Sequence, residues 1–263
     1  MKQLSILCIG DVFGEPGRRV LAHFLPRLRS ELEVDLVVAN VENAAAGFGV
    51  TPALARGFLD GGVDVLTSGN HIWDRKEIIE YIVKENLLLR PANYPRGTPG
   101  VGAVVVKAGA EKVGVLNLQG RVFMQAIDCP FLKADEELAR LRAETPIVVV
   151  DMHAEATSEK QAMGWYLDGR ASAVVGTHSH VQTADERVLP GGTAYVTDLG
   201  LTGPIDSVIG VAKEQAIERF VTGMPNRFEP ARGRARLQGV VIRVDPQSGR
   251  ATGIERVQRD LAA

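Results

Sequence analysis

Five short apolar runs bounded by turn residues constrain the fold of this chain more than any other feature of its sequence. The runs are LSILCIG, DLVVANV, VDVLTSG, PIVVVDM and ASAVVGT. Short runs rich in valine, isoleucine and leucine are typical of strands that are buried on both faces of a parallel sheet. Segments with helical periodicity lie between them, so the sequence predicts an α/β fold.

The expected strands and helices alternate through most of the chain and then give way to hairpins. Pro26 is expected to bend or divide the first helix, and Thr51 followed by Pro52 predicts the start of the second. The segment 199–225 is a long connection that contains one helix and could cover a site. The predicted strands are 3–9, 35–41, 63–68, 101–107, 113–118, 146–151 and 171–176, then short strands around 187–197 and a closing hairpin of 236–245 and 251–259; the other predicted helices are 14–32, 52–60, 74–85, 133–144 and 158–168.

Length and charge bound the domain organisation and the partners. A chain of 263 residues with 45% hydrophobic content can bury a substantial core, so we expect a single domain over 1–263. The net charge of −2 gives no sign of a surface that binds duplex nucleic acid. Arginines do gather in NRFEPARGRARLQG, residues 226–239, which we interpret as a solvated loop and an edge strand. A nucleic-acid partner is therefore not indicated, although contact through a local basic patch is left open as an alternative.

The sequence predicts the cellular compartment by what it lacks. The chain runs from Met1 directly into an apolar strand, and no apolar stretch approaches the ~20 residues of a membrane span. We therefore expect a cytoplasmic protein without membrane contact, and a homo-oligomer is compatible with a loop-rich chain of this type. Cys8 lies in the first strand and Cys129 precedes Pro130, so both are expected to be packing residues rather than part of a disulfide, zinc or redox site.

Side chains that bind metals follow each of the five apolar runs. Four of the five histidines are among them, whereas His23 lies within a predicted helix, where we expect a structural or surface role. Because ligands bind beyond the carboxyl ends of strands in open α/β sheets, these side chains should gather at one rim. Their joint placement predicts a metal centre. The residues are Asp11, Glu42, Asn43, Asn70, His71, His153, His178 and His180.

Two local spacings refine this prediction. His178 and His180 share one side if their segment is extended, whereas a turn would direct them to two neighbouring ions. Glu42 and Asn43 are adjacent after a strand, so both can face one cavity, the carboxylate as a bridge and the amide oxygen as a neutral ligand. Asp11 and Glu42 together leave two divalent ions short of neutral. The remaining positive charge suits an anionic substrate.

At these residues the chain resembles the calcineurin-like metallophosphoesterases. That family carries Asp-x-His, Gly-Asp, Gly-Asn-His-Asp/Glu, a single His and Gly-His-x-His, each after a strand. Here the segments 10–13, 41–43, 69–72, 152–153 and 176–180 match in the same order, except that Phe13, Glu42 and Ile72 replace a histidine, the bridging aspartate and an acidic residue. The resemblance implies a four-layer αββα sandwich of two mixed sheets with helices on the outer faces, forming one metallophosphoesterase domain.

The three departures are similar to the pattern of the YmdB-like bacterial phosphodiesterases. That family combines Asn-His-x-Trp-Asp with Glu-Asn at the bridge, and residues 70–74 and 42–43 carry this pattern. The resemblance implies a metal-dependent phosphodiesterase acting on small-molecule phosphodiesters. The implied substrates are 2′,3′-cyclic nucleotides, with 3′,5′-cyclic nucleotides as an extension, hydrolysed through a hydroxide activated at a dinuclear site.

Carried over residue by residue, the resemblance implies two divalent or mixed-valence ions bridged by Glu42. Oxygen and imidazole ligands without a thiolate favour Fe, Mn or Zn. The resemblance favours iron, with manganese or zinc as alternatives. The first ion would be held by Asp11, Asn43 and His180, and the second by Asn70, His153 and His178.

The resemblance also implies that His71, beside the ligand Asn70, is the acid for the leaving oxygen or a donor to the transition state. Its usual acidic partner is absent at Ile72. Asp74 is a candidate substitute, but the favoured interpretation is that Asp74 caps the following helix. Trp73 either stacks on a base or packs in the wall of the site.

Three other functions compete with this hypothesis: a metal-dependent phosphomonoesterase, a hydrolase of amides or carboxylic esters, and a non-catalytic RNA-binding regulator that keeps the metals for structure. A panel of esters separates the first two from a phosphodiesterase. The third predicts that metal removal unfolds the chain, whereas an enzyme with a preformed site would lose activity and keep its secondary structure.

Overall fold

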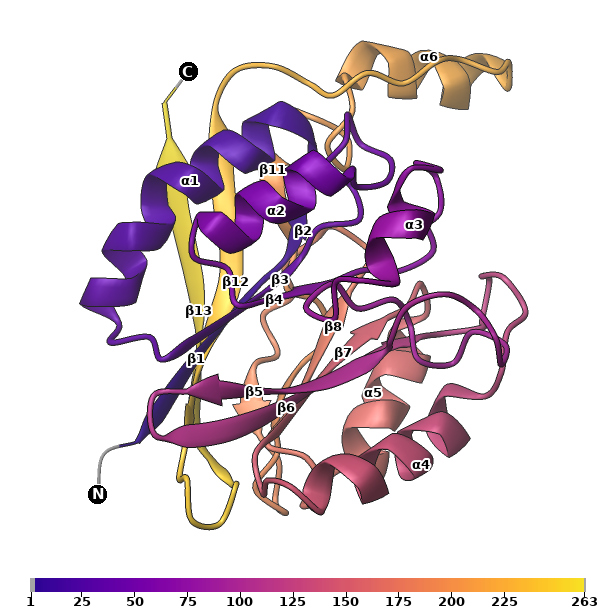
Figure 1. Cartoon of the computed structure of the whole chain (residues 1–263). Helices are drawn as coiled ribbons and strands as arrows, with labels where there is room; N and C mark the ends of the chain where they lie inside the picture. The colour runs from indigo at the N-terminus through magenta and orange to yellow at the C-terminus, as the bar shows by residue number, and fades with distance from the viewer. Residues whose placement is uncertain (1–2, 263) are drawn as a thin grey trace.

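The apolar runs form two mixed β-sheets that pack face to face, with helices on both outer faces (Figure 1). The computed structural model describes residues 3–262, so the predicted domain limits at residues 1 and 263 lie outside the described part. The first sheet has the order β2-β11-β12-β1-β3-β4, with β13 paired to β12, and the second has the order β5-β6-β7-β8-β10-β9. The four-layer αββα sandwich predicted from the sequence is confirmed.

The elements have the following bounds. The first sheet contains β1 (Leu4–Ile9), β2 (Asp11–Val12), β3 (Leu36–Asn40), β4 (Val65–Thr67), β11 (Leu201–Pro204), β12 (Ala235–Val244) and β13 (Ala251–Leu261). The second contains β5 (Ala103–Ala108), β6 (Glu111–Gln119), β7 (Val148–His153), β8 (Ala173–Thr177), β9 (Arg187–Val188) and β10 (Ala194–Val196). The helices are α1 (Gly14–Glu31), α2 (Pro52–Asp60), α3 (Ile78–Ile82), α4 (Pro130–Arg142), α5 (Thr157–Tyr166) and α6 (Lys213–Thr222).

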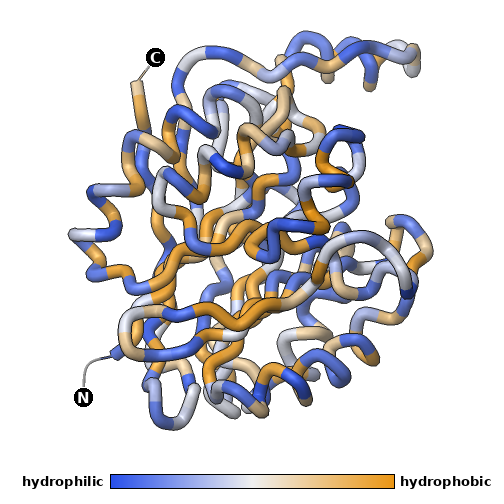
Figure 2. Tube along the Cα trace, viewed as in Figure 1, coloured by the Kyte–Doolittle hydropathy of each residue, from blue (hydrophilic) through white to orange (hydrophobic). Residues whose placement is uncertain are grey.

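Alternation along each strand divides the core into layers. In β1, Leu7 and Ile9 pack in the cluster that also contains α1 and α2, whereas Ile6 and Cys8 face the second sheet. The other face of the second sheet packs against α4 and α5 through a third cluster that includes Leu138. Figure 2 shows the strands as the most hydrophobic part of the chain. Both faces of the central strands are thus buried, as their continuous apolar runs predict.

The parallel strands bring the ends of the apolar runs together. β1, β3 and β4 are parallel neighbours in the first sheet, and β6, β7, β8 and β10 are parallel neighbours in the second. The predicted hairpins β5–β6 and β12–β13 are antiparallel, as expected. Figure 1 shows α6 apart from the two helical layers, on the connection that was predicted to cover a site.

The structure corrects four local predictions. Pro26 lies on the exposed face of α1 and does not divide that helix. The helix predicted over 74–85 is short, because turns occupy 70–77 before α3 begins. The strands β2 and β11 were not predicted; they are two and four residues long and pair with each other. β12 is not an edge strand, since it pairs with β1 on one side and with β13 on the other.

Two further observations concern the cysteines and the membrane prediction. Cys8 and Cys129 are both free thiols, Cys8 within β1 and Cys129 at the start of α4. Among residues 3–262, no helix is both long enough and apolar enough to span a membrane.

Candidate metal centre

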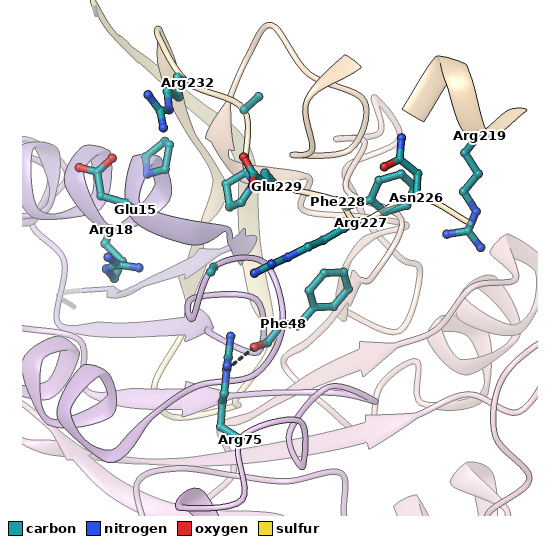
Figure 3. Close-up of a pocket in the computed structure, with 14 residues that line it drawn as sticks. Glu15, Arg18, Phe48, Arg75, Arg219, Asn226, Arg227, Phe228, Glu229 and Arg232 are labelled. Carbon is teal, nitrogen blue, oxygen red and sulfur yellow. Dashed lines mark hydrogen bonds between the residues drawn. The ribbon is translucent and has the colours of Figure 1, made fainter. Parts of the chain in front are cut away.

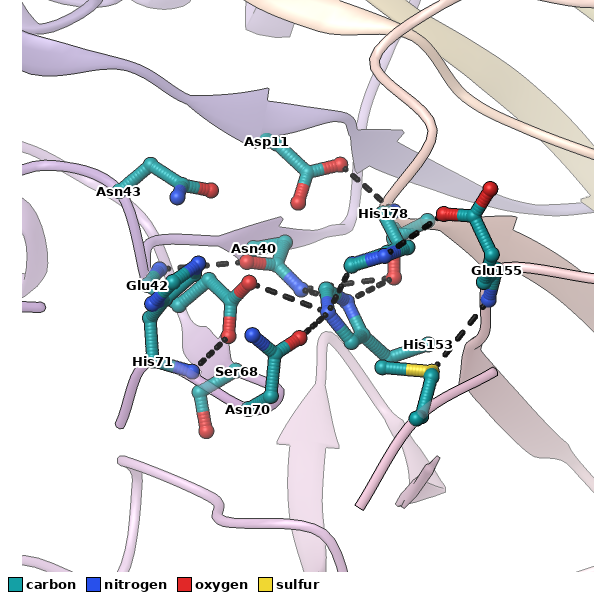
Figure 4. Close-up of polar contacts among 12 residues, drawn as sticks. Asp11, Asn40, Glu42, Asn43, Ser68, Asn70, His71, His153, Glu155 and His178 are labelled. Carbon is teal, nitrogen blue, oxygen red and sulfur yellow. Dashed lines mark hydrogen bonds and ion pairs between the residues drawn. The ribbon is translucent and has the colours of Figure 1, made fainter. Parts of the chain in front are cut away.

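The candidate ligands lie where the carboxyl ends of strands from both sheets converge. The register aligns Asn40 of β3 with Thr67 of β4, and His153 of β7 with Thr177 of β8. The residues that follow these strand ends therefore leave each sheet at the same level. Figure 4 shows side chains from both sheets pointing toward one another across this junction.

Glu42, His153 and His178 form the tightest part of the junction, with one ligand atom from each lying within 4.8 Å of the others. His153 Nε2 lies 3.0 Å from Glu42 Oε1, 3.0 Å from Asn70 Oδ1 and 3.1 Å from His178 Nδ1. Glu42 and His153 are buried, and His178 is half-buried. Two carboxylate or amide oxygens and two imidazole nitrogens that converge in this way are a donor set for a transition-metal ion.

A buried hydrogen-bond chain behind His153 orients its ring. His153 Nδ1 lies 2.9 Å from the hydroxyl of Thr177, and that hydroxyl donates to Asp151 Oδ1 at 2.7 Å. Because the Thr177 proton is directed to Asp151, His153 Nδ1 is the donor to Thr177, and Nε2 is the nitrogen that faces Glu42 and the junction. Such outer partners typically fix the tautomer of a metal-binding histidine.

Sequence reasoning missed Asp151, although a signal was present. Side chains two apart in a strand share a face, so an aspartate two residues before His153 in an otherwise apolar run points to the same side. Burial raises the pKa of Asp151 to about 6, although the hydrogen bond from Thr67 acts to lower it.

Asp11 and Asn43 aim oxygens into the same space. Among the residues that the structure describes, Asp11 Oδ1 and Asn43 Oδ1 are buried and have no hydrogen-bond partner. Asn43 donates its amide proton to Gly47 O at 2.9 Å, which turns Oδ1 away from the backbone and leaves it free to accept. Buried polar atoms without a partner are costly, so these two oxygens fit a bound cation.

His178 and His180 lie on a turn rather than on an extended segment. Their φ angles are 99° and 64°, in the left-handed region. His178 faces His153, whereas His180 Nε2 lies 3.8 Å from Asp11 Oδ1 and its Nδ1 contacts Ile209 O at 2.9 Å. The turn therefore separates the two imidazoles, which is the second of the two geometries considered from the sequence.

The electrostatics of the junction favour a positive charge. Burial acts to raise the pKa of Glu42, but His153 and the backbone N–H of His71 hold it at about 2, so Glu42 is a carboxylate. Burial acts to lower the pKa of His153, but Glu42 and Asp11 raise it to about 9. Burial and His153 lower the pKa of His178 to about 3. The carboxylates thus favour a cation at this point, and a metal ion supplies one.

His71 lies beside this cluster, and its backbone and ring make separate contacts. Its backbone N–H donates to Glu42 Oε2 at 2.9 Å, and its ring Nδ1 lies 2.8 Å from Asp74 Oδ2. Asp74 is therefore the acidic partner of His71. The interpretation of Asp74 as a helix cap is wrong, because α3 begins at Ile78 after an N-cap at Glu77.

Aromatic residues form part of the wall. Trp73 is half-buried, packs against the core and meets the buried Tyr94 ring edge-on at 5.9 Å between centroids, so its packing role is observed. Phe48, which sequence reasoning did not select, lies edge-on to His71 at 5.2 Å. Phe13 lies edge-on to His180 at 5.8 Å, at the position where the motif has a histidine.

A buried ion pair supports the histidine turn. Lys160 of α5 is fully buried and binds Asp198 Oδ2 at 2.6 Å. The same oxygen accepts hydrogen bonds from the hydroxyl and backbone N–H of Ser179, at 2.7 and 3.1 Å. Ser179 stands between His178 and His180, so Asp198 fixes the backbone that carries both imidazoles. His23, by contrast, is exposed on α1, as expected.

Comparison with known proteins gives extensive matches. Residues 7–257 match the family model described as YmdB-like protein. The chain is 51% identical over 254 residues to the 2′,3′-cyclic-nucleotide 2′-phosphodiesterase of Bacillus subtilis (strain 168), an alignment that covers 97% of this chain and 96% of that protein.

Two solved structures are also similar along their whole length. A hypothetical protein from Thermus thermophilus has 42% identity and a TM-score of 0.92, with 98% of this chain and 99% of that chain covered. A novel phosphatase from Mycoplasma pneumoniae has 33% identity and a TM-score of 0.93, with 99% and 94% covered.

Proposed function

Because the chain belongs to the family of YmdB-like proteins, we propose that it is a metal-dependent phosphodiesterase that hydrolyses 2′,3′-cyclic nucleotides. The observation that carries the proposal is the convergence of Glu42, His153 and His178, beside buried oxygens of Asp11 and Asn43 that accept no hydrogen bond from the described residues. The B. subtilis relative, named as a 2′,3′-cyclic-nucleotide 2′-phosphodiesterase, supports the choice of substrate.

We assign the metal ligands as the motifs imply. Glu42 would be shared by two ions, and its carboxylate is held by the backbone N–H of His71. When bound, two metal ions supply an acidified water and neutralise charge on the phosphate oxygens. Imidazole and oxygen donors favour iron, manganese or zinc, and iron is our first choice. Asp11, Asn43 and His180 would hold one ion, and Asn70, His153 and His178 would hold the other.

His71 donates a proton to the leaving oxygen. Its Nδ1 is held by Asp74, so Nε2 is the atom that faces away from this partner and is free to meet the substrate. The carboxylate of Asp74 holds the His71 ring at Nδ1 and so orients Nε2. In the net reaction, a water oxygen forms a new bond to phosphorus, the bond from phosphorus to O2′ breaks, and the proton ends on O2′. The product is a nucleoside 3′-phosphate.

Product analysis tests this function directly. Metal-loaded protein is incubated with 2′,3′-cyclic AMP, and the products are separated by chromatography beside 2′-AMP and 3′-AMP standards. The expected result is 3′-AMP, formed at least about tenfold faster than phosphate is released from p-nitrophenyl phosphate. Faster hydrolysis of the monoester would make the protein a phosphomonoesterase instead.

A further inference from the structure

A hollow rich in arginine lies beside the candidate metal centre. It has a volume of about 740 Å³ and is formed by α1, α6, the loop around Phe48, and the segment 226–232. We call it the arginine hollow, since five arginines line it against two glutamates. Figure 3 shows these side chains arriving from separate parts of the chain. The arginines are Arg18, Arg75, Arg219, Arg227 and Arg232.

The arginine hollow and the metal centre share a wall. Phe48 lines the hollow and also lies edge-on to His71, the residue to which we assign proton donation. Arg75 holds the loop of Phe48 in place by donating to the carbonyl oxygens of Phe48 and Ala45, at 3.0 and 2.7 Å. A ligand at His71 therefore has the hollow as its neighbour.

A second link runs through the segment 226–232. Ala231 N–H donates to Gly210 O at 2.9 Å, and the adjacent Ile209 O contacts His180 Nδ1 at 2.9 Å. The segment that carries Arg227 and Arg232 is thus tied to the turn of the candidate ligands. Residues 226–232 of the basic stretch line the hollow, and Arg227 and Arg232 are exposed, as the predicted solvated loop implies.

The positive charge of the arginines is not neutralised by acidic groups in the hollow. Arg227 and Arg232 are exposed, and neither has a hydrogen bond or ion pair to any of residues 3–262. Arg219 stacks over Phe228 at 5.2 Å, and Phe48 keeps 39% of its surface exposed. Free guanidinium groups bind phosphates, and exposed aromatic rings and stacked arginines bind bases. This combination fits a single-stranded nucleic acid.

We propose that the enzyme acts on the 3′ ends of single-stranded RNA that carry a 2′,3′-cyclic phosphate, with the arginine hollow binding the nucleotides upstream of that end. This inference rests on the proposed function of the metal centre. A cyclic mononucleotide places only a 5′-hydroxyl on the upstream side and leaves the arginines unused. An RNA end places a phosphodiester and a base there, which the arginines and Phe48 can bind.

The test compares two substrates with the same reactive group. The kcat/KM of metal-loaded protein is measured for 2′,3′-cyclic AMP and for tetra-adenylate ending in a 2′,3′-cyclic phosphate. We expect a kcat/KM about tenfold or more higher for the tetranucleotide at low salt. Its logarithm should fall with the logarithm of salt concentration, with a slope of about 0.7 for each phosphate contact, whereas the value for the mononucleotide should change less.

Variants test whether the arginine hollow causes the preference for the tetranucleotide. Arg227→Ala and, separately, Arg232→Ala should each lower the ratio of tetranucleotide to mononucleotide kcat/KM toward one, and Arg227→Lys should restore part of it. The matched control is Arg187→Ala, because Arg187 is an exposed arginine that stacks on Trp165 at the edge of the second sheet. The control should keep the full ratio. Circular dichroism checks that each variant is folded.

The outcomes separate this inference from the function on which it rests. Equal kcat/KM values for the two substrates in the wild-type protein would overturn the RNA-end inference and leave the proposed function standing. A ratio unchanged in both the Arg227 and the Arg232 variants would overturn the role of the hollow. If metal-loaded protein hydrolyses neither substrate, the proposed function itself fails.

Discussion

At the scale of single residues, the proton donation that we propose for His71, with Asp74 as its partner, can be tested by substitution. His71→Ala should keep both metal ions while kcat falls by about 10² to 10⁴, the range for loss of a positioned proton donor. Asp74→Asn should lower kcat by about 10- to 100-fold, because Asp74 acts through the His71 ring that it holds at 2.8 Å. Kinetics with a series of leaving groups measure both effects.

The leaving-group dependence distinguishes proton donation from other roles. Both losses should shrink for bis(p-nitrophenyl) phosphate, since p-nitrophenolate leaves without a proton. Losses of equal size for all leaving groups would mean that His71 binds the phosphate instead. If His71→Ala lost metal in proportion to activity, His71 would be a ligand.

The bridging role that we propose for Glu42 predicts a distinct loss of metal. Glu42→Ala should lower the occupancy of both ions, whereas His180→Ala should lower mainly the ion shared with Asp11. Inductively coupled plasma spectrometry of the purified variants measures this. His23→Ala is the control, because His23 is exposed on α1 far along the helix from the junction. Full metal content in the Glu42 variant would refute the bridge.

At the scale of elements, close packing at the strand ends leaves no room for a larger residue at Gly69. A Cβ on Gly69 would lie 2.0 Å from the His153 ring. Gly69→Ala should therefore displace His153, and lower metal affinity and kcat/KM by about 10- to 100-fold, as loss of a ligand's support does. Gly57→Ala in α2 is the matched control, because a Cβ there meets nothing within 4 Å. An active, fully loaded Gly69→Ala protein would contradict this packing argument.

The ion pair between Lys160 of α5 and Asp198 should stabilise the fold as well as position the histidine turn. Lys160→Met would leave Asp198 buried without its cation, so the free energy of unfolding should fall by about 3–5 kcal/mol. Urea denaturation followed by circular dichroism measures the change. Lys107→Met is the control, since Lys107 is exposed on β5. A similar stability for the two variants would show that the hydrogen bonds from Ser179 and Gly200 suffice for Asp198.

The elements also show what the sequence could and could not predict. Strands such as β7 were predicted because a run buried on both faces is apolar throughout. β2 and β11 were not, because strands of two and four residues owe their pairing to tertiary contacts rather than to a local pattern. The helix predicted over 74–85 is longer than α3, because the helical periodicity of the sequence continues through turns. The contact between His71 and Asp74 stabilises those turns.

At the scale of the whole molecule, the candidate site depends on both sheets. Glu42 and Asn70 follow strands of the first sheet, whereas His153 and His178 belong to the end of the second. The motifs predicted which residues would gather, because each motif lies at the end of a strand, and ligand sites in α/β folds form at the carboxyl ends of strands. They could not predict the arginine hollow, whose residues come from α1, α6, two loops and the turn that carries Arg75. Such a surface exists only once the layers are packed.

The central claim is that two metal ions at this junction hydrolyse a cyclic phosphodiester. The most direct test removes metal with a chelator, restores iron or manganese in steps, and follows metal per chain together with 2′,3′-cyclic AMP hydrolysis. We expect that secondary structure persists without metal, because the layered core is preformed, and that activity saturates at two ions per chain. Full activity without metal, or saturation at one ion, would contradict it.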